Sequence, residues 1–218
     1  MEIKICGLTT SEAVATATKA GASHLGFIFY GPSPRAITPR RAAEISREAG
    51  LDTKKVAVFV NPSDAEISAA VNALAPDLLQ LHGAESPGRV AELKRMFDVP
   101  VMKVIPVSHA RDIKMADTFQ GLADLILFDT KPPKDGRGML PGGNGLTFDW
   151  TLLADRIGKG AWFLSGGLDA NNIAEAVRIT GASAVDVSSG VESRPGEKSL
   201  AKITAFLAVA KDLEIDLA

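Results

Sequence analysis

The sequence predicts an α/β domain of eight parallel strands, each followed by a helix. Short apolar runs recur eight times along the 218 residues, at a mean spacing of about 27 residues, close to the length of one strand–helix unit. The runs are continuously apolar, without a two-residue alternation, which is typical of strands buried on both faces. Segments with helical spacing and recognisable ends lie between them. This alternation favours a parallel sheet.

The predicted strands are rich in Val, Ile and Phe, and each is bounded by polar or turn-forming residues. We predict them at 2–6, 25–30, 55–60, 78–81, 100–105, 123–128, 161–165 and 184–187.

Three helices have clear end signals. The first starts after Thr10 and ends before Gly21, and the second has Pro39 at its first position and ends at Gly50. The third opens with the capping-box pattern SDAE at 63–66. Further helices are predicted at 86–97, 108–119, 148–157, 169–180 and 197–212.

Eight strand–helix units close in one of two ways, as a barrel or as an open doubly wound sheet. A count of eight favours the barrel. The open sheet is disfavoured because no G-x-G-x-x-G motif follows the first strand, where Gly7 stands alone. No linker or low-complexity tract divides the chain. We therefore predict a single-domain (β/α)8, or TIM, barrel over residues 1–218.

Composition excludes several classes of function. The net charge of −2 offers no basic field for a nucleic-acid backbone, and one cysteine excludes a disulfide scaffold. No run approaches the ~18 apolar residues of a membrane span. The first seven residues carry charges where a signal peptide needs apolar residues. We expect a cytoplasmic protein without a nucleic-acid or membrane partner.

In a TIM barrel, residues that act on a ligand come from the carboxyl ends of the strands, because side chains fill the interior. These ends carry a thiol, a guanidinium, an imidazole, amides, carboxylates and two turns rich in Gly and Ser. Since all eight ends meet at one rim, we expect these groups to share a cavity. They are Cys6, Tyr30, Arg35, Asn61, Gln80, His82, Asp129, Ser165, Gly166, Gly167, Asp186, Ser188, Ser189 and Gly190.

The last two turns predict a phosphate site. The segments 165–169 and 188–190 follow the seventh and eighth strands, where barrels commonly hold a phosphate against backbone N–H groups. Two ordinary tight turns are the alternative. The longest connection, 130–147, contains Gly143 and Gly145 and predicts a mobile lid over the rim; an insertion without a role is the alternative.

Cys6 and Asp129 are the candidates for proton transfer. A lone cysteine is more often a buried apolar residue, but Cys6 ends the first strand and Gly7 leaves open space beside it. A thiol used as a base needs nearby positive charge or a helix N-terminus. Asp129 either caps a turn or is a carboxyl, partly desolvated by the apolar run 125–128, that donates a proton near neutral pH.

Arg35, Gln80 and His82 have simpler interpretations that stay open: a solvated surface cation and polar filling at the barrel end. No spacing of His, Cys, Asp and Glu suggests a metal, and no Ser-His-Asp set is present. We therefore expect neither a metal nor a cofactor.

The chain resembles the phosphoribosylanthranilate isomerase family, in motifs that run from residue 3 to about 198. The motifs are KICGLT at 4–9, LGFIF at 25–29, SPR at 33–35, VFVN at 58–61, LQLHG at 79–83, LFD at 127–129, FDW at 148–150, SGGL at 165–168 and VSSGVE at 187–192. The loop sequence GGNGL at 142–146 and Ser199 depart from the usual family pattern, and neither involves the residues assigned to proton transfer.

The resemblance implies an Amadori rearrangement of a phosphosugar–anthranilate substrate in tryptophan biosynthesis, by a monomer or homodimer without a cofactor. Asp129 is then the general acid and Cys6, as a thiolate, the general base. Arg35 pairs with the anthranilate carboxylate. The remaining assignments are Gln80, His82 and Asp186 at the substrate, and Gly143, Gly145, Gly166, Gly167, Ser188, Ser189 and Gly190 at the phosphate.

Two other interpretations compete with this one. Among other phosphosugar barrels, pentose-phosphate epimerases rely on paired carboxylates and metal-binding histidines, which this rim lacks. The synthase that forms indoleglycerol phosphate relies on a catalytic lysine and glutamate, and a bifunctional sugar isomerase usually has a carboxylate at the end of the first strand, where this chain has Cys6. A phosphosugar-binding barrel without activity would have no use for an acid and a base at one rim.

Overall fold

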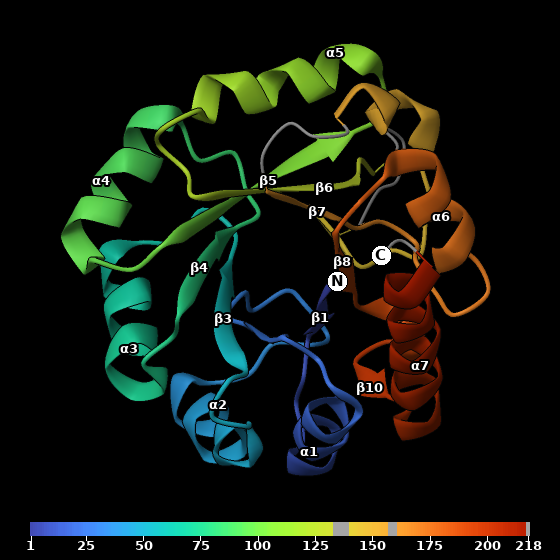
Figure 1. The fold of residues 1–218 in the computed structure, drawn as a ribbon. Helices are drawn as coiled ribbons and strands as arrows, with labels where there is room; N and C mark the ends of the chain where they lie inside the picture. Colours follow the sequence, from blue (N-terminus) through green and yellow to red (C-terminus); the bar gives the residue numbers. More distant parts are fainter. Residues whose placement is uncertain (133–139, 157–160, 217–218) are drawn as a thin grey trace.

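Eight parallel strands close into a barrel in the computed structural model, which describes residues 1–132, 140–156 and 161–216 (Figure 1). Each strand pairs with its neighbour in sequence, and β1 pairs with β8 to close the ring. The strands are β1 (Glu2–Cys6), β2 (His24–Ile28), β3 (Lys54–Phe59), β4 (Leu78–Leu81), β5 (Val101–Val107), β6 (Leu125–Thr130), β7 (Trp162–Leu164) and β8 (Ala184–Val187). The predicted TIM barrel is confirmed.

Helices surround the barrel on its outside (Figure 1). The α-helices are α1 (Ser11–Ala20), α2 (Pro39–Ile45), α3 (Asp64–Leu74), α4 (Pro87–Phe97), α5 (Ala110–Ile113), α6 (Ile173–Thr180) and α7 (Leu200–Asp216). Short 3₁₀ helices are η1 (Ser46–Glu48), η2 (Lys114–Phe119), η3 (Trp150–Arg156) and η4 (Ser189–Val191), and β9 (Glu192–Arg194) pairs antiparallel with β10 (Glu197–Lys198).

The end signals of α1 and α3 act as predicted. The Thr10 hydroxyl accepts from the Ala13 N–H at 3.2 Å, and Gly21 ends α1 in the left-handed region at φ 93°. Ser63 and Glu66 form the reciprocal capping box of α3. These bonds satisfy backbone groups that have no partner within the helix, and so fix where each helix starts or stops.

Other predicted boundaries are wrong. The second helix stops at Ile45 and continues only as η1, so Gly50 is not its end, and the segment predicted at 108–119 is a short α5 followed by η2. The segment predicted at 148–157 is the 3₁₀ helix η3, and its residue 157 lies outside the described residues. Residues 133–139 of the predicted loop and 217–218 of the predicted domain also lie outside them. The sixth helix starts at Ile173 because the Asp169 side chain first caps a turn by accepting from the N–H groups that follow it. The last helix starts at Leu200, because residues 197–198 form β10.

β6 extends beyond its apolar run. We predicted the strand to end at residue 128, but Asp129 continues it and lies opposite Pro106 of β5. Alternate residues of a strand face opposite sides, so Leu127 and Asp129 face the barrel interior together. The polar residue is therefore part of the strand, which holds its carboxylate more firmly than a loop would.

The core has two parts, one inside the barrel and one between the strands and the helices. The outer part includes Ile3, Ile5 and Phe27, and the inner part includes Val58, Met102 and Leu127. Because the helices cover the outer part, the open rim at the strand carboxyl ends is left for a site.

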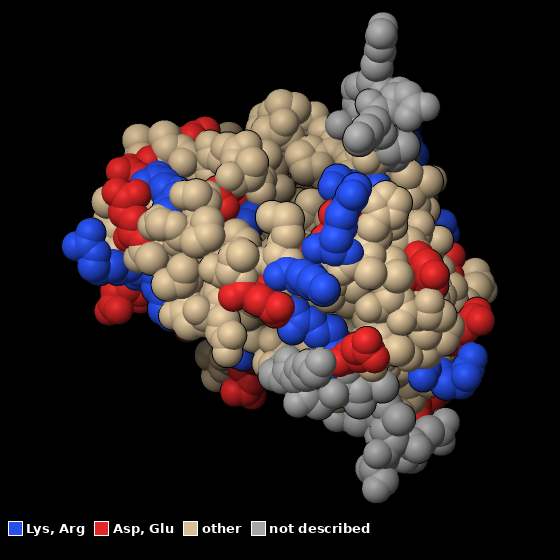
Figure 2. Space-filling model, turned by 90° about the horizontal axis from the view of Figure 1, so that it is seen from above, with Lys and Arg blue, Asp and Glu red and all other residues tan. Residues whose placement is uncertain are grey.

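One face of the molecule carries charges of both signs (Figure 2). In the view of Figure 2, Lys and Arg side chains lie next to Asp and Glu side chains, so this face presents no extended field of one sign. Over the residues that are described, no helix combines the length and the apolar character of a bilayer span.

Candidate active site

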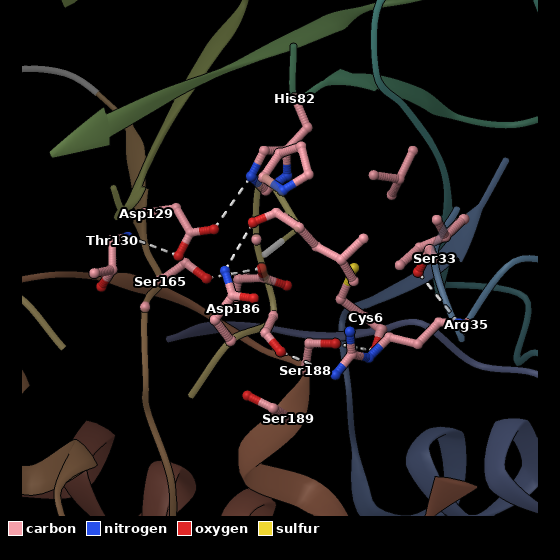
Figure 3. Close-up of a pocket in the computed structure, with 18 of the residues that line it drawn as sticks. Cys6, Ser33, Arg35, His82, Asp129, Thr130, Ser165, Asp186, Ser188 and Ser189 are labelled. Atoms are coloured by element: carbon pink, nitrogen blue, oxygen red, sulfur yellow. Dashed lines mark hydrogen bonds and ion pairs between the residues drawn. The ribbon is translucent and has the colours of Figure 1, made fainter. Parts of the chain in front are cut away.

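A pocket opens at the carboxyl ends of the strands. Figure 3 shows Cys6, His82, Asp129 and Asp186 pointing into it from different strands. The residues predicted for the rim that line it are Cys6, Tyr30, Arg35, Gln80, His82, Asp129, Gly143, Gly145, Ser165, Gly166, Gly167, Asp186, Ser188 and Ser189. The barrel thus brings together groups that lie far apart in the sequence. Gly190 and Asn61 are not among the lining residues.

Cys6 ends β1 and is 5% exposed, at the floor of the pocket. Gly7, at φ 78°, turns the chain away immediately after it. Burial raises the pKa of the Cys6 thiol above its usual value, and neighbouring Lys4 opposes this rise. The group is therefore mainly a thiol at neutral pH.

Asp129 faces Cys6 from β6, across the pocket (Figure 3). Its Oδ1 accepts from the Thr130 N–H at 2.8 Å, and its Oδ2 lies 3.2 Å from Nε2 of His82. The Asp129 side chain is buried. It is thus held in one orientation with one oxygen directed to the pocket side, where a ligand hydroxyl or ring oxygen could accept its proton.

Gln80 and His82 continue the wall next to Asp129. Nε2 of Gln80 lies 3.5 Å from Nδ1 of His82, while the Gln80 Oε1 is buried without a hydrogen-bond partner among the described residues. A buried acceptor without a partner is costly unless a ligand or water supplies a donor. This oxygen is a candidate contact for a substrate hydroxyl.

Arg35 is already paired within the protein. Its Nε and Nη2 donate to the two carboxylate oxygens of Glu192 at 2.7 and 2.8 Å, and Nη2 also donates to the Gly143 carbonyl at 3.0 Å. Glu192 in turn accepts from Lys198 at 2.7 Å, and Lys198 donates to the Ser188 carbonyl at 2.8 Å. A substrate carboxylate would therefore meet a cation whose orientation is fixed by a second carboxylate.

Sequence reasoning missed Glu192 and Lys198, although Glu192 stands within the VSSGVE motif. Both belong to the small β9–β10 sheet, and neither follows a barrel strand directly. An ion pair between Arg35 and Glu192, 157 positions apart, has no local signal in the sequence.

The two Gly/Ser turns form one wall of the pocket. The N–H groups of Gly166 and Gly167 donate no hydrogen bond to any described residue, so both are available to an anion. A Cβ on Gly166 would lie 2.2 Å from Oγ1 of Thr130, and one on Gly167 would lie 2.7 Å from the Leu146 backbone. Ser188 donates to the Cys6 carbonyl at 3.1 Å, which ties this wall to β1.

Three further glycines predicted at the phosphate lie against neighbouring parts of the chain. Gly190 packs beneath the turn after β7, where a Cβ would come within 1.9 Å of the Leu168 carbonyl. Gly143 lies against Arg35, whereas Gly145 lies on the side of Ser189. Close packing against the chain excludes a side chain at position 190, and a phosphate contact of its N–H group stays a prediction.

The described part of the predicted loop, residues 140–147, covers the pocket from above. Leu140 to Leu146 line it, and Asn144 donates to the Leu140 carbonyl at 2.8 Å. A Cβ at Gly142 would meet both His82 and Asp129 within 2.7 Å. This segment therefore lies on the catalytic candidates themselves.

In the part of the chain that the structure describes, no three His, Cys, Asp or Glu side chains are grouped to hold a metal ion. The pocket offers proton donors and acceptors, a fixed cation and backbone N–H groups. Such a set fits acid–base chemistry on an anionic ligand.

A family model described as N-(5'-phosphoribosyl)anthranilate (PRA) isomerase matches residues 3–209. The chain belongs to this family. The motifs that carried the resemblance are thus those of the phosphoribosylanthranilate isomerase family, over nearly the full chain.

Individual relatives agree with the family model. The N-(5'-phosphoribosyl)anthranilate isomerase of Parvibaculum lavamentivorans is 49% identical over 211 residues, covering 97% of this chain and 98% of its own length. The isomerase of Rhizobium johnstonii is 51% identical over 205 residues, covering 94% of this chain and 91% of its own length.

Solved structures of the family share the fold. The isomerase of Thermotoga maritima superposes with a TM-score of 0.84 at 35% identity, covering 97% of this chain and 99% of that one. A phosphoribosylanthranilate isomerase in complex with reduced 1-(o-carboxyphenylamino)-1-deoxyribulose 5-phosphate gives the same TM-score at 32% identity, with the same coverage.

Proposed function

We infer that this protein converts N-(5'-phosphoribosyl)anthranilate to 1-(o-carboxyphenylamino)-1-deoxyribulose 5-phosphate, an Amadori rearrangement in tryptophan biosynthesis. The observation that carries this function is one pocket lined by the Asp129 carboxyl from β6 and the Cys6 thiol from β1, beside a turn whose Gly166 and Gly167 N–H groups donate no hydrogen bond to any described residue. The complex of a family member with a reduced form of this product supports it.

We propose that Asp129 starts the reaction as general acid. The furanose ring opens when its oxygen takes a proton while the substrate nitrogen forms a Schiff base with C1. Asp129 is held by the Thr130 N–H, which leaves Oδ2 on the pocket side beside His82. A carboxyl placed in this way gives its proton to the ring oxygen and becomes a carboxylate.

Cys6 then acts as general base in this proposal. Its thiolate removes the proton from C2, and the C2–H electron pair moves toward the protonated Schiff-base nitrogen to give an enolamine. Tautomerisation of the enolamine gives the ketone. Because the substrate nitrogen accepts the electron pair, the reaction requires only one acid and one base.

The proposed contacts divide the pocket between the two ends of the substrate. The phosphate lies against the two Gly/Ser turns, of which Gly166, Gly167, Ser188 and Ser189 line the pocket and Gly190 completes the second turn. At the other end, Arg35 meets the anthranilate carboxylate. Gly145, on the Ser189 side, reaches the phosphate from the loop. Gln80, His82 and Asp186 contact the sugar and the anthranilate between the ends.

Loss of anthranilate-type fluorescence on turnover tests the function. Freshly generated substrate is mixed with the wild-type protein and, in parallel, with Asp129→Asn. We expect rapid decay with wild type and a kcat lower by ~10²–10⁴ for the variant, because the proton donor is lost. Stable fluorescence with wild type, together with binding, would mean a phosphosugar-binding barrel without this activity.

The proposal includes a soluble, cytoplasmic pathway enzyme that acts as a monomer or homodimer on a small molecule. A solved relative from Thermotoga maritima is described as dimeric. Light scattering of the purified chain decides between the two states.

A further inference from the structure

A lysine lies fully buried in the barrel interior beside the proposed base. Lys4 is on β1, two residues before Cys6, so the strand alternation points both side chains inward. Its Nζ donates to Oδ1 of Asp186 at 2.8 Å. Burying an ammonium costs several kcal/mol, and an apolar side chain of similar length would fill the space without that cost. The position of the charge therefore needs an explanation.

Lys4 is held from the neighbouring strand of the barrel, β8. Asp186, on β8, lies opposite Lys4 in the strand register, and its second oxygen accepts from the Ser165 hydroxyl at 3.0 Å. Both carboxylate oxygens are thus occupied, and the ammonium is fixed at one place.

The space between the lysine and the thiol is left open by Gly26 of β2. A Cβ at this position would lie 2.9 Å from the Cys6 Sγ and 3.1 Å from the Lys4 Nζ. Both atoms therefore reach the same small volume, which any larger residue at position 26 would fill. The ammonium lies close enough to the sulfur to favour its negative form.

Neighbouring charges both raise and lower the pKa values of Lys4 and Cys6. Burial is the largest single effect on the pKa of Lys4 and lowers it. Asp186 and Cys6 together outweigh burial, so the pKa lies above its usual value and Lys4 remains an ammonium at neutral pH. Burial and then Asp186 raise the pKa of Cys6, while Lys4 and, from β10, Lys198 lower it. Lys4 exerts a larger lowering effect than Lys198.

We propose that Lys4 is a positioning residue for the reaction: its ammonium, fixed by Asp186 and Ser165, stabilises the thiolate of Cys6 against the cost of burial and so makes this group available as a base. The proposal rests on the role of Cys6 given under the proposed function. It assigns Lys4 no contact with the substrate.

The thiol itself provides the test, because Cys6 is the only cysteine of the chain. With ¹³Cβ-labelled cysteine, the chemical shift of a single signal reports thiol ionisation over neutral to alkaline pH, without substrate. We expect Lys4→Met to raise the pKa of this thiol by about 1–3 units, the effect typical of losing an adjacent opposite charge. The low-pH limb of the kcat profile should shift upward with it.

Lys103→Met is the matched control. Lys103 is also buried on a barrel strand, and its Nζ also donates to a buried carboxylate, that of Glu85, at 2.8 Å. It does not line the pocket. Both variants lose a buried ion pair, so a general loosening of the fold would move the thiol signal in both. A rise in the Lys4 variant alone supports the proposal, and equal titration in Lys4→Met and wild type overturns it.

A double variant covers the case in which Lys4→Met does not fold. Lys4→Met with Asp186→Asn leaves no unpaired carboxylate. Its thiol pKa should still rise, by less, because Lys4 acts on Cys6 more strongly than Asp186 does; an unchanged or lower pKa overturns the proposal. The activity of Cys6→Ala is measured separately, and full activity in that variant would show that Cys6 is not the base. The thiol titration is independent of that result and decides whether Lys4 controls the charge of Cys6.

Discussion

At the scale of single residues, environment decides what each group does. Cys6 is a weak base in water, and burial makes its ionisation harder still, so its use depends on nearby cations. Asp129 is held by one backbone bond with its other oxygen beside His82. Neither feature follows from residue type; each follows from the neighbours that the barrel supplies.

The pH profile tests the role of Cys6. Because burial raises the pKa of its thiol and the base is the thiolate, activity should increase with pH across the neutral to alkaline range. Cys6→Asp should move this limb to lower pH, since carboxyls ionise several units below thiols, and Cys6→Ala should abolish the limb. A wild-type rate that is flat with pH while the thiol titrates would contradict the assignment.

At the scale of elements, the turn after β7 depends on a backbone without side chains. Gly166 has φ 94°, and a Cβ there would lie 2.2 Å from Oγ1 of Thr130 and 3.2 Å from Oδ1 of Asp129. The turn therefore packs directly on the β6 end, and its shape is coupled to the position of the acid.

Gly166→Ala should weaken phosphate binding and lower kcat, because the turn must shift both its N–H groups and Asp129. Inorganic phosphate titrated by calorimetry and steady-state kinetics measure the two effects. Gly88→Ala is the control: it lies in α4, its Cβ would meet nothing closer than 3.9 Å, and alanine there should stabilise by about 0.5–1 kcal/mol. Unchanged phosphate affinity in Gly166→Ala would remove this turn from the site.

The β9–β10 sheet has a comparable role next to the turn after β8. Its Glu192 joins Arg35 and Lys198, and Lys198 reaches the Ser188 carbonyl. One carboxylate thereby links the proposed anthranilate contact to the phosphate turn. Burial raises the pKa of Glu192, but Arg35 and Lys198 together lower it below its usual value. Glu192 therefore remains ionised at neutral pH.

Glu192→Gln should raise KM and destabilise the fold by ~3–5 kcal/mol, the cost typical of leaving a buried ion unpaired. Urea unfolding and steady-state kinetics measure both. Glu197→Gln, on the exposed strand β10 of the same sheet, should leave the unfolding midpoint and KM close to wild type. Equal behaviour of the two variants would show that Glu192 does not organise the pocket.

At the scale of the whole molecule, ionisable groups inside the barrel connect stability to pH. His24 opens β2 and is fully buried, with Nδ1 2.9 Å from the Ser23 hydroxyl and its ring packed edge-on against Phe163. Burial lowers the pKa of His24 to about 4. The folded chain therefore keeps this ring neutral at a pH where the unfolded chain binds a proton.

This difference sets a pH window for stability. Above about pH 6.5, His24 is neutral in both the folded and the unfolded state, so it adds no pH dependence to the free energy of unfolding. As the pH falls from about 6.5 to 4, only the unfolded state binds the proton, and the free energy of unfolding falls by on the order of 3 kcal/mol. His24→Gln should flatten this part of the curve of unfolding free energy against pH, measured by urea unfolding. An equal slope of unfolding free energy against pH in wild type and His24→Gln would show that another group causes the pH dependence.

The sequence by itself determined the barrel, because eight continuously apolar runs separated by capped helical segments leave few other ways to bury both faces of a parallel sheet. It also determined which polar residues reach the rim, because a strand end fixes where its last residue lies; Cys6 and Asp129 were found in this way. Only the tertiary structure decided their partners. Lys4 looks like an ordinary charge in a strand, Glu192 follows no barrel strand, and nothing in the sequence shows that Gly190 packs against Leu168. Such pairings join residues up to 182 positions apart, and depend on how the closed barrel packs its interior, for which local sequence carries no signal.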